Sequence, residues 1–167
     1  MPDWLTHVII GWGIFNLLTI RWKNIQQFKS AVIVGSILPD LWNIRLILEQ
    51  IGLDLTWQLY VFHTPLGALL TALLISLIFF KEDVWSQGAF FLAIGVGLHL
   101  ALDLTLRHIG GGHYVLFPIS WQLYELGIFW PETFTPLFLA VIFGTASYIF
   151  TKHVKENKGT NYTNKIG

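Results

Sequence analysis

Three residues with side chains suited to bind metal follow one another in the stretch GLHLALDLTLRH. His99 and Asp103 are four residues apart, and His108 follows Asp103 by five residues. Residues four apart project from the same face of a helix, so this imidazole and this carboxylate would point the same way. Imidazole and carboxylate ligands suit zinc, and also iron or manganese. The spacing therefore predicts part of a metal site.

Further residues of the same kinds interrupt apolar segments elsewhere in the chain. An ionisable or metal-binding side chain inside a membrane segment is costly, and this makes it a candidate functional residue. The complete set of candidate metal ligands is His7, Asp40, His63, His99, Asp103, His108 and His113. Two carboxylates and five imidazoles are more than one tetrahedral ion needs, so one or two ions are expected.

The composition indicates which class of protein carries these residues. The chain has 167 residues, of which 54% are hydrophobic and 12% charged, whereas soluble domains carry about 25% charged residues. The formal net charge of zero argues against a nucleic-acid partner. The absence of cysteine excludes disulfides and thiolate metal ligands. The composition predicts an integral membrane protein surrounded by lipids.

The apolar runs predict an all-α membrane helical bundle with five segments. Three are long enough to span a bilayer, which takes about 20 apolar residues; they are 59–80, 85–107 and 130–151. Two shorter N-terminal helices are expected at 5–21 and 29–40. We expect residues 1–151 to form one membrane-embedded domain, and residues 152–167 to form a polar, disordered cytoplasmic tail.

If these five segments alternate in direction, all seven candidate ligands fall at one end of the bundle. Eight lysines and arginines then lie on the other side, and only Arg45 and Arg107 share the side of the candidates. Basic residues favour the cytoplasmic side. The sequence therefore predicts a plasma- or inner-membrane protein of prokaryotic type, with its site at the extracytoplasmic face. The oligomeric state is left open.

Each candidate also has an ordinary structural interpretation. His7 could be an interfacial or helix-capping residue. Asp40 could simply end a helix behind Pro39, and His63 could hydrogen-bond a neighbouring helix. The His99–Asp103 pair could be a buried ion pair or part of a proton relay.

Two candidates in the segment after residue 107 have a similar interpretation. His108 and His113 flank a run of glycines and could be ordinary loop residues. Glu125 could be an outer ligand or a solvated charge, and we interpret it as a solvated charge.

The order of these motifs resembles the membrane-bound, metal-dependent hydrolases of the YdjM-like group. The residues that carry the resemblance are Thr6-His7 with Gly11, GSILPD ending at Asp40, His63-Thr64, and His99-x3-Asp103 with Thr105 and LFP at 116–118. The resemblance covers roughly residues 5–118. It implies a small multi-helix inner-membrane protein.

That group is in turn similar to the helical fold of zinc-dependent phospholipase C and P1 nuclease. The resemblance implies metal ligands at His7, Asp40, His63, His99, Asp103 and His108. Two features depart from these patterns. The stretch QLYVF before His63 lacks the histidine and arginine that the membrane family often has, and no His-x3-Glu follows His113. One or two zinc ions are therefore expected rather than three.

The function expected from these residues is metal-dependent hydrolysis of a phosphoester, with a phospholipid headgroup as the natural substrate. The metal would lower the pKa of a water molecule. Asp40 would act as base or bridge two ions, Asp103 would be both ligand and catalytic residue, and Arg107 would hold the phosphate. The alternatives are a metal-ion or proton transporter, and a non-catalytic membrane protein with a structural polar cluster.

Overall fold

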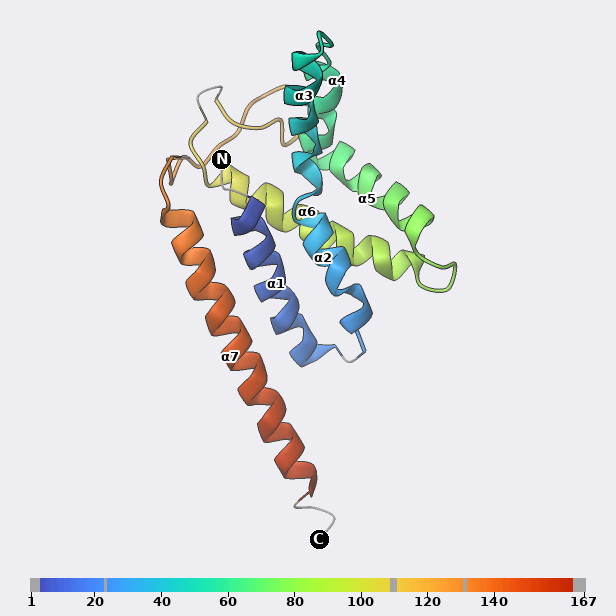
Figure 1. The fold of residues 1–167 in the computed structure, drawn as a ribbon, viewed down its shortest axis with the longest axis vertical. Coiled ribbons are helices and arrows are strands. Elements are labelled where there is room, and N and C mark those ends of the chain that lie inside the picture. Colours follow the sequence, from blue (N-terminus) through green and yellow to red (C-terminus); the bar gives the residue numbers. More distant parts are fainter. Residues whose placement is uncertain (1–3, 23, 109–110, 131, 164–167) are drawn as a thin grey trace.

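The computed structural model describes residues 4–22, 24–108, 111–130 and 132–163. In these residues the regular elements are helical, and extended pairing is limited to two isolated β-bridges, one of them between His113 and Tyr124. The elements shown in Figure 1 are α1 (Trp4–Arg21), η1 (Gln26–Phe28), α2 (Lys29–Gly35), η2 (Leu38–Ile44), α3 (Arg45–Gln50), α4 (Thr56–Tyr60), η3 (Val61–His63), α5 (Pro65–Phe79), α6 (Trp85–Leu104) and α7 (Thr135–Thr163).

Two of these helices, α6 and α7, are long and apolar enough to cross a membrane. Two bent pairs pass the same test when each is taken as one span. They are Gln26–Gly35 with Leu38–Gln50, bent by 41°, and Thr56–His63 with Pro65–Phe79, bent by 79°. The all-helical prediction is confirmed in the described residues. The predicted number of full spans is not, because 59–80 is a broken segment rather than one helix.

The break in that segment has a local cause at Thr64 and Pro65. Proline disfavours helical backbone in the residue before it and is well suited to the first turn of a new helix. Thr64 is extended, with ψ of 151°, and its hydroxyl accepts a hydrogen bond from the Gly67 N–H at 3.2 Å. The 15 residues of α5 cover about 22 Å, less than the roughly 30 Å of a bilayer core. His63 therefore lies at a helix break.

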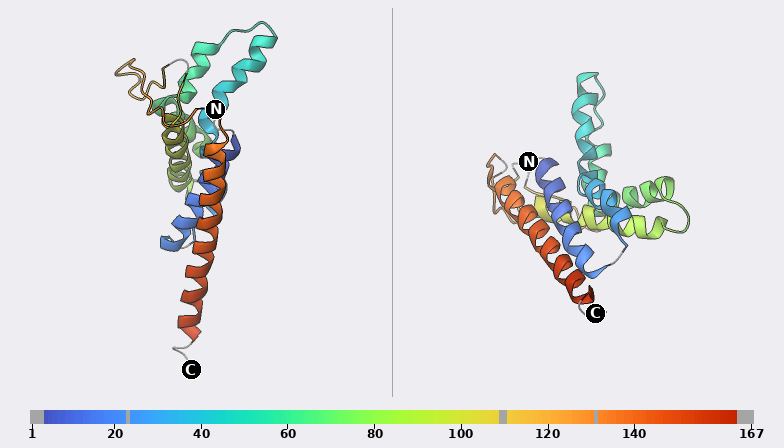
Figure 2. Two further views of the ribbon diagram at one scale, coloured as in Figure 1. Left: turned by 90° about the vertical axis from the view of Figure 1, so that its left-hand side faces the viewer. Right: turned by 60° about the horizontal axis from the view of Figure 1, so that its bottom comes forward.

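The second predicted helix, 29–40, also ends early. Helix α2 stops at Gly35, and the chain continues as the 3-10 helix η2, with Pro39 in its first turn. Helices α3 and α4 then form a short hairpin that stands out from the other helices in Figure 2. The turn through η2 packs this segment against α6 and places Asp40 near His7 and His99.

The remaining helices pack around α6 and α1. Helices α2 and α5 pack against α6, and α7 packs along α1, as Figures 1 and 2 show. The buried core between them is apolar and includes Phe15, Phe28, Val32, Leu92 and Val96. Large apolar side chains also cover the outer faces of α5 and α7, where Ile78 is 72% and Phe138 67% exposed. Such faces suit contact with lipid rather than water.

Helix α7 continues to Thr163, through most of the segment expected to be a disordered tail. Contacts between residues four apart support this extension. Lys152 Nζ lies 3.9 Å from Glu156 Oε1, and Asn157 Nδ2 lies 3.1 Å from His153 Nε2. Residues 152–163 are therefore helical, and residues 164–167 of the expected tail lie outside the described part of the chain.

Candidate metal centre

Four elements bring five of the predicted ligands together in the protein interior. His7 comes from the first turns of α1, Asp40 from η2, and His63 from the end of η3, while His99 and Asp103 come from α6. Figure 1 shows the start of α1 beside the end of α6, which is where these residues meet. All five side chains are buried. The predicted convergence at one end of the helices is present in the structure.

Asp103 is the residue on which the histidines converge. Its Oδ2 atom lies 2.9 Å from His63 Nε2 and 3.2 Å from His99 Nε2. Its other oxygen, Oδ1, lies 3.3 Å from His7 Nε2. The Nε2 atoms of His63 and His99 are 3.2 Å apart. Two ligands of a tetrahedral ion with bonds of about 2.1 Å are about 3.4 Å apart, so these separations match atoms that share an ion.

The hydrogen bond made by the other nitrogen of His99 fixes how its ring faces the cluster. His99 Nδ1 lies 2.8 Å from the carbonyl oxygen of Ser36. A carbonyl oxygen can only accept a hydrogen bond, so Nδ1 carries the hydrogen. In a neutral ring, Nε2 then has no hydrogen and presents a lone pair. That lone pair faces the Asp103 carboxylate. This lone pair therefore needs a hydrogen or a cation, which can be the N–H of His63 Nε2 at 3.2 Å, a proton or a metal ion.

Several buried polar atoms of the cluster have no hydrogen-bond partner in the described residues. They are His7 Nδ1, His63 Nδ1 and Asp103 Oδ1, whose 3.3 Å contact with His7 Nε2 is not a hydrogen bond. A buried polar atom without a partner lowers the stability of the fold by about 1–3 kcal/mol. A bound ion or molecule that contacts such an atom removes this penalty. Asp103 Oδ1 could be satisfied by a metal ion. The donor set of imidazoles and carboxylates fits zinc, and also iron or manganese.

The donor atoms form two overlapping groups. One comprises His7, Asp40 and His99, and the other His63, His99 and Asp103; within each group one donor atom per residue lies within 4.8 Å of the others. Because Nδ1 of His99 is engaged with Ser36, only its Nε2 can bind an ion. His99 can therefore belong to one coordination shell at a time.

His108 and His113 form a second pair next to this cluster. Their Nε2 atoms are 2.9 Å apart, and the His113 ring stacks on His63 with the ring centroids 4.6 Å apart. The backbone holds His113 in place through mutual N–H to carbonyl hydrogen bonds with Tyr124. Burial lowers the pKa of His113 to about 3, so this ring is neutral at pH 7.

Gly112 makes that arrangement possible. Its φ of 103° lies in the left-handed region that favours glycine, and a Cβ atom there would collide with the backbone of Tyr124. Gly112, which sequence alone places in an ordinary loop, therefore helps to position His113 at the cluster.

The structure does not bring Arg107 to the cluster. Its guanidinium lies over the ring of Trp130, 4.6 Å from the centroid, and the described residues show no contact between it and the buried histidines. A role in holding phosphate would require this side chain to leave Trp130, so that role stays a prediction.

Three groups that contact the candidate ligands were not predicted from the sequence, or were given another role. Ser36 acts through its backbone carbonyl, which no sequence pattern reveals. Asn43 donates from Nδ2 to Asp40 Oδ1 at 3.0 Å, and its place three residues after Asp40 was an available signal. Glu125, interpreted as a solvated charge, accepts a hydrogen bond from the His108 N–H at 2.7 Å. It lies 3.6 Å from Nδ1 of the same histidine.

Two glycines set the distance between α2 and α6, and hence the orientation of His99. A Cβ on Gly95 would collide with the Val32 carbonyl and the Ser36 N–H, and one on Gly35 would collide with the Leu92 carbonyl. Small residues at such contacts let helix backbones approach closely. This close approach brings the Ser36 carbonyl within reach of His99.

Replacing Gly95 by alanine is therefore expected to weaken metal binding about tenfold or more, the size of effect seen when an outer hydrogen bond to a ligand is lost. Gly97→Ala is the matched control, since a Cβ there meets open space on the same helix. Metal titration of both purified variants measures the difference. Equal affinities would show that the α2–α6 distance does not orient His99.

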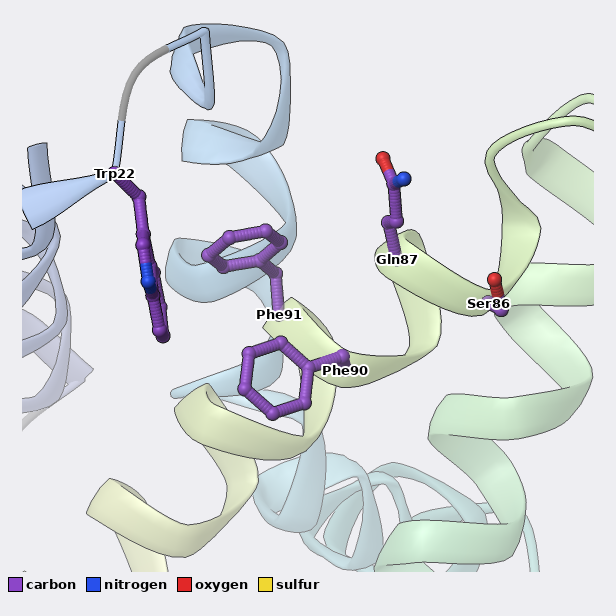
Figure 3. Close-up of a pocket in the computed structure, with 5 residues that line it drawn as sticks. All are labelled: Trp22, Ser86, Gln87, Phe90 and Phe91. Carbon is purple, nitrogen blue, oxygen red and sulfur yellow. The ribbon is translucent and has the colours of Figure 1, made fainter.

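A separate pocket at the opposite end of α6 offers no comparable chemistry. It has a volume of about 220 Å³ and is lined by Trp22, Ser86, Gln87, Phe90 and Phe91, as Figure 3 shows. Phe91 precedes Asp103 by 12 residues, which is about 18 Å along a helix. None of the lining residues is a histidine or a carboxylate.

The fold and the cluster together define a helical membrane protein with a buried histidine–carboxylate centre. The model of the YdjM inner membrane protein family matches residues 1–163, and the chain belongs to that family. This confirms the resemblance to the YdjM-like group and agrees with helices suited to a membrane. Comparison with curated proteins and with solved structures gives no match. Similarity to phospholipase C and P1 nuclease stays a prediction.

Proposed function

We propose that this protein is a membrane-bound metal-dependent hydrolase that cleaves a phosphoester. The observation that carries the proposal is the buried cluster in which His99 Nε2 lies 3.2 Å from Asp103 Oδ2 while His99 Nδ1 contacts the Ser36 carbonyl. His99 and Asp103 would hold a metal ion, which would take the place of a hydrogen between two acceptors. Zinc suits this donor set best, and iron or manganese also fit.

The two oxygens of Asp103 favour a two-ion arrangement. Oδ2 faces His63 and His99, whereas Oδ1 faces His7. Because His99 offers only one nitrogen, a second ion would rely on His7, Asp40 and Asp103 Oδ1. Asp103 would thus serve both ligand groups, with Oδ2 toward His63 and His99 and Oδ1 toward His7, and Asp40 would lie at the edge of the centre.

Bound divalent ions would supply Lewis acidity and a water molecule of lowered pKa. Asp40 would accept a proton at Oδ2, because its Oδ1 is held by the Asn43 amide. His99 and Asp103 lie in the last two turns of α6, within about 8 Å of its end. A centre near the end of a membrane helix lies at the depth of lipid headgroups, which supports a phospholipid as substrate and, by the charge count, an extracytoplasmic site.

Transport is the weaker candidate. A path for ions or protons needs polar groups that continue toward the other end of the helices. In the described residues the core beyond the cluster is formed by side chains such as Phe15, Val32 and Leu92. Among the described residues, the buried polar groups away from the cluster are the hydroxyls of Ser76, Ser147 and Thr151 and the amide nitrogen of Asn16. This arrangement favours an enclosed site.

The test is hydrolysis by detergent-purified protein of a panel of phosphoesters and phospholipids, together with elemental analysis. The wild type is expected to hold one or two ions per chain and to release phosphate or a phosphorylated headgroup. Asp40→Asn is expected to lower the rate by about 10²–10⁴-fold, as loss of a general base does, with at least one ion retained.

His153→Ala on the exposed end of α7 is the control and should change neither readout. Bound metal without turnover of any phosphoester would contradict the hydrolase and indicate a structural metal. Absence of metal after reconstitution with each ion would contradict the metal centre itself.

A further inference from the structure

A second pocket adjoins the candidate centre on the side facing the projecting hairpin. It has a volume of about 240 Å³ and lies between the start of α1, the end of α2, η2 and α3. Its lining is mostly apolar, with side chains that include Trp4, Val34, Ile37, Leu41, Ile44 and Ile47.

The polar end of this pocket belongs to the metal centre. Asp40 is the one charged residue in its lining, and Asn43, which is hydrogen-bonded to Asp40, is its other strongly polar side chain. A donor oxygen of Asp40 also lies within 4.8 Å of ring nitrogens of His7 and His99. One carboxylate is thus shared between an apolar pocket and a cluster of metal ligands.

The other end of the pocket is open to the surroundings of the protein. Val34, Ile44, Ile47 and Trp4 at its rim are all exposed. In a chain of an inner membrane protein family, exposed aliphatic side chains beside a tryptophan are typical of the boundary between acyl chains and headgroups. A molecule would therefore enter from the lipid rather than from water.

We propose that this pocket binds part of one acyl chain of a membrane phospholipid, and that the phosphoester of this lipid lies at the Asp40 end. The assignment rests on the proposed hydrolase function and names its substrate. An amphiphile is the ligand that matches an apolar pocket ending at a polar centre.

The size of the pocket favours an acyl chain over a helix of a second protein chain. Pockets for whole drug-sized ligands span about 300–1,000 Å³, so about 240 Å³ accommodates a segment of one chain. A helix of a second copy or of a partner is about 10–12 Å wide and needs a longer groove.

The experiment uses a phosphatidylethanolamine that carries a diazirine in one acyl chain. The purified protein in lipid nanodiscs is photolysed with this lipid, and the labelled peptides are identified by mass spectrometry. Val34→Trp fills the rim of the pocket. Val141→Trp on α7 is the matched control, because Val34 is 41% and Val141 46% exposed and only Val34 lines the pocket.

In the wild type, labelling is expected to concentrate in residues 34–47 relative to the outer face of α7. It should fall about fivefold or more in Val34→Trp, because overfilling a packed space is costly, and remain in Val141→Trp. Equal labelling of the pocket and the α7 face, or equal labelling in the two variants, would show only ordinary lipid contact and overturn the proposal. A dimeric protein with no lipid label at 34–47 would overturn it in favour of a dimer interface.

A second arm separates this proposal from the proposed function. Hydrolysis of a short-chain, water-soluble phosphoester tests the function without the pocket. If the hydrolase stands, Val34→Trp should raise the KM of a long-chain phospholipid relative to that of the short-chain ester about fivefold. Pocket labelling without hydrolysis of either ester would contradict the function and the assignment of the lipid as substrate. If both esters are hydrolysed and Val34→Trp leaves the ratio of their KM values unchanged, the assignment of the pocket is contradicted and the hydrolase function is not.

Discussion

Replacing Asp103 by alanine is expected to remove bound metal from the protein and to abolish hydrolysis. Both oxygens of this carboxylate face imidazole nitrogens, at 2.9–3.3 Å. The variant would therefore remove the carboxylate that His7, His63 and His99 all contact. Loss of an outer hydrogen-bonding partner already weakens metal binding about 10–100-fold. Loss of a direct, bridging ligand should exceed the upper end of that range. Elemental analysis and phosphoester turnover, measured on the same preparation, give both quantities.

Two further variants keep this prediction interpretable. Asp103→Asn preserves the shape of the side chain and removes its charge, so it should fold while still losing most of the metal. Asp83→Asn removes an exposed carboxylate from the segment between α5 and α6 and should behave as the wild type. If Asp103→Ala keeps the metal content of the wild type, the cluster is not the metal centre.

Removal of the metal is expected to lower the unfolding temperature markedly. An ion that binds only the folded state at about 100 times its Kd stabilises that state by about 2.7 kcal/mol. For a chain of this size each kcal/mol corresponds to roughly 2–4 °C, so Tm should fall by roughly 5–11 °C on chelation. The physical reason is that without a cation the buried lone pair of His99 and the Asp103 carboxylate face each other directly. Thermal unfolding in detergent, with and without a chelator, measures the shift.

The same measurement on Asp103→Ala supplies the control. A variant that cannot hold the ion should unfold at one temperature whether or not chelator is present, and re-addition of zinc should restore Tm only in the wild type. A wild-type Tm that does not respond to chelator or to added metal would indicate that a proton, not a metal ion, neutralises the cluster.

The candidate metal ligands were identifiable from the sequence alone. Helical periodicity places His99 and Asp103 on one face of α6, and the prediction depends only on the four-residue spacing. The alternating direction of successive apolar segments was enough to gather His7, Asp40 and His63 at the same end. Both arguments use local pattern and connectivity, so their conclusions still hold when the predicted ends of a helix are wrong by a few residues. The predicted span 59–80 contained a helix break, yet His63 still reached the centre.

Several features of the centre depended on the tertiary structure. The Ser36 carbonyl that fixes the tautomer of His99 is 63 residues away in sequence, and it reaches the ring because Gly35 and Gly95 let two helices touch. Arg107 was expected at the site but packs on Trp130, since the direction of a long exposed side chain depends on its neighbours. Glu125 reaches His108 only through the fold of the segment between α6 and α7.

The sequence by itself determined the class of protein and the kinds of ligand, because composition, apolar length and i,i+4 spacing are local properties of the chain. The tertiary structure decided which ligands share an oxygen of Asp103, where Asp40 meets an apolar pocket, and where the helices break and bend. These properties arise from contacts between helices, and their distances are set by packing that no single segment encodes.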